Sequence, residues 1–245
     1  MIVEYATLDL GDRQAPVEIR VNRRAKRLIL KVDTIRARVI VTSPSKAAIP
    51  EAISFATSRA AWLREQLAAS VGARPFVPGA EFPLEGAPHI IVNEGGPRSR
   101  IRTGASADGH PALFVGGDPA HTNRRVADWL KKRARRTLTE QTDDFCAQLD
   151  VKRGPISVRD TKSRWGSCAS DGALSFSWRL ILAPPWVLTY VAAHECAHLI
   201  HLDHSPAYWR TLATINADAS AARAWFREHG ETLYGYGINQ EMAAA

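Results

Sequence analysis

Alternating apolar and polar positions dominate the first third of the chain. Residues 17–21, 28–32 and 36–42 alternate in this way, which predicts half-buried strands. Apolar residues then recur near one face of a segment that Ser45 can cap, which predicts a helix over about 46–69. Glycine and proline are dense from 74 to 119, where we expect turns and short strands at 89–92, 100–103 and 112–115.

Helical periodicity dominates the rest of the chain. A long amphipathic helix is predicted from Asp118-Pro119 to about residue 149, followed by strands at 156–160 and 173–178. Further helices are predicted to begin at Pro184-Pro185 and at Ser205-Pro206, since proline suits a first turn. A last helix spans 219–229 and ends at Gly230. We identify no internal repeat, and we expect an α+β fold with a β-rich region and one helix over 1–117, followed by a second domain over 118–245.

Composition favours an ordinary soluble globular protein. The 245 residues are 45% hydrophobic and 23% charged, enough to bury one sizeable core or two smaller ones. The amino terminus lacks the basic and apolar regions of a secretory signal, and the longest apolar run, 180–193, is too short to span a bilayer. The three cysteines, at 146, 168 and 196, are odd in number and widely spaced. We therefore expect no membrane partner, no disulfide framework and a reducing cytoplasm.

Positive charge is concentrated in part of the long helix. The net charge is +7, and the segment from Arg124 to Arg136 contains seven basic residues and one acidic residue, Asp128. A second cluster comprises Arg20, Arg23, Arg24, Lys26 and Arg27. A basic stripe like the one from Arg124 to Arg136 could bind nucleic acid or another polyanion. A solvated helix face is the commoner explanation of a run of charged residues. Both interpretations stay open.

The segment His194-Glu195-Cys196-Ala197-His198 carries the strongest chemical signal. Two histidines four residues apart lie on one helical face, so both imidazoles can reach one metal ion. Glu195 lies beside that face, where a carboxylate can deprotonate a metal-bound water. A lone helical histidine is usually an ordinary core or surface residue. The predicted helix around His194 and His198 is apolar, however, and polar side chains inside it need partners. The spacing therefore predicts a hydrolytic zinc site.

Several blocks of the sequence resemble the YgjP-like metallopeptidases, relatives of the SprT-like and Wss1-like proteases within the zincin group. The specific blocks are 161–168, 178–185, 194–199 and 204–209, with weaker similarity at 23–28 and 62–63. The resemblance implies a minimal zincin-like catalytic domain, here expected over 118–245. It also implies one zinc ion per chain bound by His194, His198 and His204, with Glu195 as the base. The sequence departs from the family pattern at Cys196, where leucine is common, and at Ser177, where asparagine is common.

The third ligand can be weighed on physical grounds as well. A ligand beyond the end of the helix can approach the ion from a new direction, and Asp203 tolerates the turn that must precede His204. His201 is the rival, because it lies on the same helical face as His198, but we expect it to pack beside the site or to orient a ligand. Weaker ligand or orienting candidates are Asp203, Glu228 and Glu231, and Cys196 lies on the wrong side of the helix.

The segment Arg164-Trp165-Gly166-Ser167 is expected to border the substrate cleft, an expectation that comes from the resemblance. The residue types alone favour packing, because a Trp-Gly pair in a strand usually marks close backbone approach. An edge strand here can pair with an extended peptide, and Arg164 can bind a substrate carboxylate or stabilise an oxyanion. Four tyrosines compete for the oxyanion role: Tyr190, Tyr208, Tyr234 and Tyr236.

The expected function is that of a zinc metallopeptidase acting on peptides or proteins. One alternative is a metal-dependent hydrolase of nucleotides or phosphate esters, which the basic stripe favours slightly. Another is a nucleic-acid-associated protein with structural zinc. A site of three histidines with an adjacent glutamate argues against the latter, because structural zinc sites are closed and commonly rich in cysteine.

Overall fold

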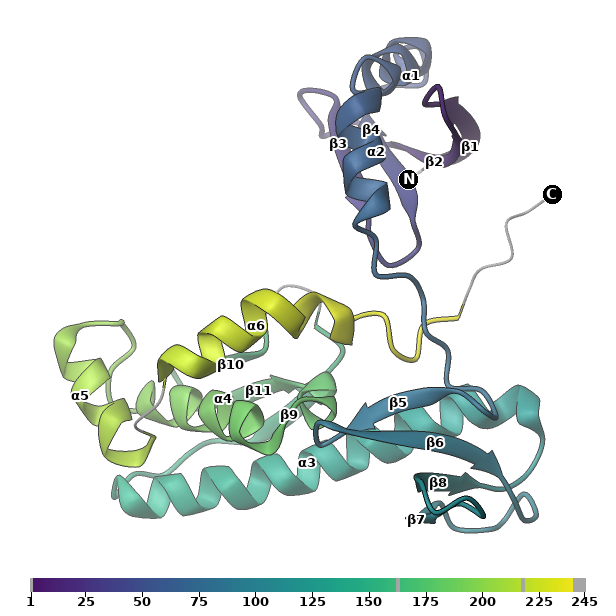
Figure 1. Ribbon diagram of the computed structural model, residues 1–245. Helices are drawn as coiled ribbons and strands as arrows, with labels where there is room; N and C mark the ends of the chain where they lie inside the picture. The colour runs from purple at the N-terminus through teal and green to yellow at the C-terminus, as the bar shows by residue number, and fades with distance from the viewer. Residues whose placement is uncertain (1, 162–163, 217–218, 240–245) are drawn as a thin grey trace. The chain divides into compact units, whose positions relative to one another are not determined.

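The computed structural model of the chain divides into two compact units, of which the first ends at Ala73 and the second spans Arg74–Asn239 (Figure 1). The structure describes residues 2–161, 164–216 and 219–239. The domain boundary expected after residue 117 therefore falls inside the second unit. The reason is that apolar residues between 82 and 115 share one buried core with the long helix that follows them.

The first unit is a four-stranded sheet with two helices. The strands are β1 (Ile2–Asp9), β2 (Gln14–Val21), β3 (Ile29–Asp33) and β4 (Arg38–Ser43), in the order β1-β2-β4-β3. The three predicted strands are confirmed as β2, β3 and β4, whereas β1 was not predicted. Buried residues of β2 and β4 share a core with the helices α1 (Ile49–Thr57) and α2 (Ala60–Ala68).

The single helix expected over 46–69 is wrong, because the chain breaks between α1 and α2. At the break, the hydroxyl of Thr57 donates to the carbonyl of Ile53 at 3.0 Å, and that of Ser58 donates to the carbonyl of Phe55 at 2.7 Å. Hydroxyl side chains that bond to nearby carbonyls compete with the regular helical ladder, which accounts for a break at these two residues.

The second unit begins with another four-stranded sheet. Its strands are β5 (Glu81–Leu84), β6 (Ala87–Asn93), β7 (Arg102–Ala105) and β8 (Pro111–Val115), in the order β5-β6-β8-β7. The predicted strands are confirmed as β6, β7 and β8, with small shifts at the ends, and β5 was missed. Asp118 then caps the short helix η1 (Pro119–His121) by accepting from the amide of Ala120 at 2.9 Å. The long helix α3 (Thr122–Gln148) follows, as predicted.

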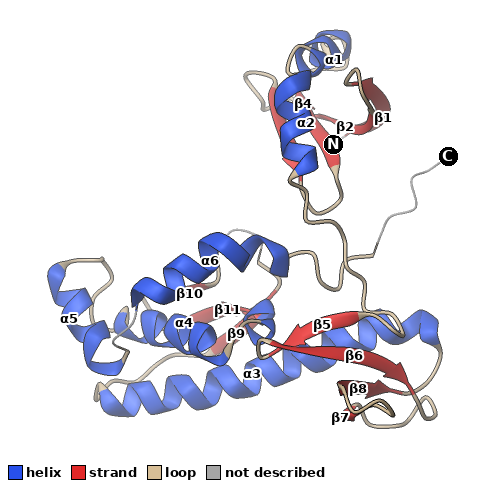
Figure 2. Ribbon diagram, viewed as in Figure 1, coloured by secondary structure: helices blue, strands red, loops and turns tan. Residues whose placement is uncertain are grey.

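The two four-stranded sheets share one topology (Figure 2). In each, the first two strands are antiparallel, the second pairs with the fourth in parallel, and the third is antiparallel to the fourth. Ile19 pairs with Val41 and Ile91 with Leu113, so the parallel partners are 22 residues apart in both sheets. A helical segment follows each sheet. The chain thus contains a repeated module, and the expectation of no internal repeat is wrong at the level of topology.

A three-stranded sheet, a short 3-10 helix and three α-helices complete the described part of the second unit. The sheet contains β9 (Ile156–Arg159), β10 (Gly166–Cys168) and β11 (Leu174–Ser177), in the order β10-β11-β9, so β10 is an edge strand. The short helix η2 (Trp178–Leu182) leads into α4 (Pro185–Ala197), which contacts α3, β10 and the later helices α5 (Pro206–Ile215) and α6 (Ala219–Leu233). Within the described ranges, no helix combines the length and the apolar character needed to cross a membrane.

Helix α6 runs past Gly230 to Leu233, so the predicted stop at this glycine is wrong. A β-carbon at Gly230 would lie 3.3 Å from the side chain of Phe226 and 3.5 Å from the ring of Trp165. The glycine therefore provides room for close packing of Trp165 against α6, and it does not end the helix.

Candidate metal centre

Helix α4 places the first two histidines. It begins at Pro185, as the sequence predicts, and most of its residues from Val187 to Ala197 are buried. The helix ends at Ala197 with His198 as its C-cap, and the chain then turns. His194 and His198 therefore lie one turn apart at the carboxyl end of a helix that is fixed by packing on nearly all sides.

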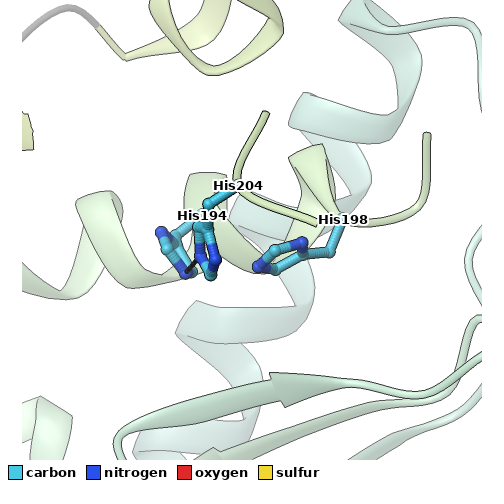
Figure 3. A group of neighbouring side chains, drawn as sticks. All are labelled: His194, His198 and His204. Carbon is cyan, nitrogen blue, oxygen red and sulfur yellow. Dashed lines mark hydrogen bonds between the residues drawn. The ribbon is translucent and has the colours of Figure 1, made fainter. Parts of the chain in front are cut away.

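The third histidine reaches the same point from beyond the helix (Figure 3). The potential ligand atoms of His194, His198 and His204 all lie within 4.8 Å of one another. The Nε2 atoms of His194 and His204 are 3.3 Å apart. Two nitrogens bound to zinc at about 2.0–2.1 Å with tetrahedral angles lie roughly 3.3 Å apart. The three side chains therefore fit a zinc ion, although no ion is part of the structure.

A backbone carbonyl orients His198. Its Nδ1 lies 2.8 Å from the carbonyl oxygen of His201, so an Nδ1–H can donate there and leave Nε2 free for a metal. His201 is not a member of the three-histidine group, and it meets the site through its main chain. This contact is the kind of orienting bond that the sequence suggested for His201, except that it comes from the backbone and not from the imidazole.

Two tyrosine hydroxyls surround the other nitrogen of His194. The Tyr208 hydroxyl lies 2.6 Å from His194 Nδ1 and 3.2 Å from the His194 carbonyl oxygen, and the Tyr190 hydroxyl lies 3.4 Å from the same Nδ1. Tyr208 is fully buried in the first turn of α5. The sequence named Tyr208 only as a competitor for the oxyanion role. The available signal was its position four residues after His204, at the start of a capped helix.

Glu195 is buried beside the three histidines, with 5% of its surface exposed. Its neighbour across the packing interface is Gly166 of β10. A β-carbon on Gly166 would lie 2.7 Å from Cγ and 2.8 Å from Cδ of Glu195, which is closer than real β-carbons come to other atoms. Burial raises the pKa of Glu195 to about 7, and the positive charge of Arg164 opposes that rise. The β-carbon distances show that the carboxyl group of Glu195 fits in this position because Gly166 has no side chain.

His194 and His198 favour the uncharged form that metals bind. Burial lowers the pKa of His194 to about 4, and the nearby charges of His198, His204 and Arg223 act in the same direction. Burial also lowers the pKa of His198. The neutral form of each imidazole, with a lone pair that can bind a metal, is therefore favoured at neutral pH.

The four residues expected to border the cleft have different surroundings. Gly166 faces Glu195, and the charge of Arg164 acts on the same carboxyl group. Trp165 stacks between Phe226 and Tyr234, with ring centroids 5.0 and 4.8 Å away. These contacts favour the packing interpretation for Trp165. Ser167 pairs with Ser175 and, with Arg164, lines a shallow hollow of about 450 Å³ on the three-stranded sheet.

The weaker candidates lie in other environments. Asp203 accepts a bond from the amide of Ser205, and Glu228 lies 3.7 Å from His229. Cys196 is fully buried, with Sγ 3.8 Å from the carbonyl oxygen of Thr142 on α3, in accord with a packing role. Tyr236 bonds to Arg74 and stacks on Phe76.

Most of the basic stripe on α3 has partners within the chain. Arg125 donates to the carbonyls of Pro97 and Ser99, and Arg135 donates to that of Ile156. Three further ion pairs are Arg133–Glu85 at 2.8 Å, Arg124–Asp128 at 3.8 Å and Lys131–Asp128 at 3.7 Å. These contacts favour a structural and solvated helix face over a nucleic-acid interface.

Comparison with known proteins identifies the family. Residues 26–229 match the family model described as "YgjP-like, metallopeptidase domain". The chain belongs to the YgjP-like metallopeptidase family. The YgjP-like match begins inside the first unit and ends in α6, so it includes the three histidines and Glu195. Membership makes the protein a metal-dependent peptidase in general terms.

Two other comparisons add little. No curated protein matches the chain. A solved structure, the metallopeptidase zymogen of Pyrococcus abyssi abylysin, is 17% identical with a TM-score of 0.34, and the match covers 38% of this chain and 93% of that one.

Proposed function

We propose that this protein is a zinc-dependent peptidase in which His194, His198 and His204 hold one zinc ion and Glu195 is the general base. The observation that carries the proposal is the convergence of the three histidines, with ligand atoms within 4.8 Å, beside a buried glutamate. Three imidazoles leave one position of a tetrahedral zinc ion open, which is the arrangement of catalytic zinc sites.

Glu195 supplies the proton transfers. Zinc, when bound, lowers the pKa of a water to about 7 and polarises a carbonyl oxygen. Glu195 accepts the proton from the attacking water and returns it to the departing amine nitrogen as the peptide bond breaks. Gly166 leaves room for this carboxyl group, because a β-carbon there would lie 2.7 Å from Cγ and 2.8 Å from Cδ of Glu195.

Strand β10 supplies a place for an extended substrate. It is the edge strand of its sheet, and Gly166 within it lies against Glu195. A peptide added to this edge would make main-chain hydrogen bonds with β10 and pass beside the base. Arg164, two residues before the strand, would bind a substrate carboxylate or stabilise the oxyanion. Ser167 would contact the substrate through its main chain, since β-augmentation depends on backbone groups.

A substrate comparison tests this function. Zinc-loaded protein is incubated separately with casein, with a peptide library and with nucleoside triphosphates, and products are followed by mass spectrometry. We expect cleavage of casein or peptides that is abolished when zinc is removed and restored when it is added back. Hydrolysis of nucleoside triphosphates without peptide cleavage would overturn the proposal in favour of a phosphate-ester hydrolase.

A further inference from the structure

The hydroxyl of Tyr208 lies between two groups of the same histidine. It is 2.6 Å from Nδ1 of His194 and 3.2 Å from the carbonyl oxygen of His194. A tyrosine hydroxyl has one proton to donate and can also accept. A neutral imidazole carries one proton, on either Nδ1 or Nε2. The arrangement of protons around Tyr208 therefore determines which nitrogen of His194 is free for a metal.

Only one tautomer of His194 gives a hydrogen bond to each of three groups: Nδ1 of His194, the Tyr208 hydroxyl and the His194 carbonyl oxygen. With the proton on Nδ1, His194 donates to the Tyr208 oxygen, and the Tyr208 hydroxyl donates to the His194 carbonyl oxygen. With the proton on Nε2, the hydroxyl proton must go to Nδ1, and the carbonyl oxygen loses this donor. Tyr208 is fully buried and its bond to the carbonyl oxygen is part-buried, so the loss of this bond costs free energy.

We propose that Tyr208 is a positioning residue that holds His194 as the Nδ1–H tautomer, with its Nε2 lone pair directed at the metal. This inference rests on the proposed function in taking the metal to be zinc, whereas the tautomer follows from the contacts of Tyr208 alone. The Nε2 atom released in this way is the one that lies 3.3 Å from Nε2 of His204. A hydroxyl that both accepts from the ring and donates to the main chain fixes the ring orientation as well as the tautomer.

The start of α5 delivers Tyr208 and His204 together. The Ser205 hydroxyl caps this helix by accepting from the amide of Tyr208, which fixes Tyr208 in the first turn. The ring of Tyr208 also stacks on His198 at 4.5 Å and meets His204 edge-on at 4.8 Å. Removal of the hydroxyl alone leaves those ring contacts in place, so Tyr208→Phe isolates the proposed effect.

Tyr190 provides a matched control. Its hydroxyl lies 3.4 Å from Nδ1 of His194, and the single Nδ1 proton is directed to the nearer hydroxyl of Tyr208. Tyr190→Phe therefore removes a hydroxyl from the same nitrogen without removing the orienting bond. Both variants replace a tyrosine with phenylalanine, but only Tyr208→Phe removes the bond between the hydroxyl and Nδ1 of His194 that is proposed to fix the tautomer.

The first experiment measures zinc affinity by chelator competition in the full-length protein. We expect Tyr208→Phe to bind zinc about 10 to 100-fold more weakly, the usual effect of losing a bond to a metal ligand. Tyr190→Phe should stay within about threefold of the wild type. Equal affinities for wild type and Tyr208→Phe would overturn the proposal, as would an equal loss in both variants.

The second experiment reads the tautomer directly in the zinc-free wild-type protein. Nitrogen-15 NMR of the histidine side chains distinguishes a protonated from an unprotonated Nδ1. We expect His194 to carry its proton on Nδ1 in the wild type and to lose this preference in Tyr208→Phe. An Nε2–H tautomer in the wild type would overturn the proposal. This readout needs neither zinc nor peptidase activity, so its outcome is separate from success or failure of the proposed function.

Discussion

The backbone of Gly166 lies against the carboxyl group of Glu195, so that a β-carbon on the glycine would come within 2.7 Å of the glutamate Cγ. Gly166 belongs to an edge strand, and Glu195 belongs to the helix that contains His194 and ends at its C-cap, His198. This contact links the strand that is expected to bind substrate to the group that is expected to move the proton.

Gly166→Ala should displace the base and spare the metal ligands. We expect kcat for peptide cleavage to fall by about 100-fold, because a shift of about 1 Å in a catalytic group can have that effect. Zinc content should stay at the wild-type value, since the three atoms nearest to the added β-carbon all belong to Glu195 and not to a histidine. Steady-state kinetics together with metal analysis checks both parts. Ser167→Ala on the same strand is the control and should change kcat little.

His204 and His201 should respond differently to alanine. His204→Ala removes one of the three converging imidazoles and should abolish tight zinc binding and activity together. His201→Ala keeps the backbone carbonyl that accepts from His198, so it should retain zinc and lose at most about 10-fold in affinity. Zinc titration of both variants decides the assignment. Loss of zinc from His201→Ala, with zinc retained in His204→Ala, would show that the third ligand is misassigned.

Arg179 should contribute strongly to stability. Its buried guanidinium bonds to Asp160 at 3.0 Å and to the carbonyls of Leu233 and Tyr236 at 2.9 and 2.5 Å, so it ties the end of α6 to the segment before β10. Arg179→Ala should lower the free energy of unfolding by about 3 kcal/mol, the lower end for a broken buried pair, because Asp160 is half exposed.

Urea unfolding of the Arg179→Ala variant measures this change. The control is Arg153→Ala, which removes a pair with the exposed Asp143 and should cost less than about 1 kcal/mol. If the two variants lose equal stability, the buried contacts of Arg179 are not the reason for its effect.

The sequence predicted what local spacing determines. His194 and His198 follow from helical periodicity, and the start of α4 follows from the fixed backbone angle of Pro185. His204 required only a turn after the helix. In each case the decisive interaction is between residues close together in the chain.

Other features depend on partners that are distant in the chain. Gly230 looked like a helix stop, because nothing local indicates that Trp165 packs against it. By its residue type alone, Gly166 suggested only close backbone approach, and its contact with Glu195 depends on the packing of β10 against α4. The repeated module was missed because its two copies share strand order and register, as the pairs Ile19–Val41 and Ile91–Leu113 illustrate, and these features exist only once distant strands have paired.

The most direct test of the central claim compares wild-type protein with Glu195→Gln. Amide replaces carboxylate with almost no change in shape, so the fold and one zinc per chain should be retained. Peptide cleavage should fall by about 10² to 10⁴-fold, the usual contribution of a general base. Metal analysis and kcat/KM on one peptide substrate provide both numbers. Full activity of Glu195→Gln with zinc bound would contradict the account, because the buried carboxyl group would then have no part in the chemistry.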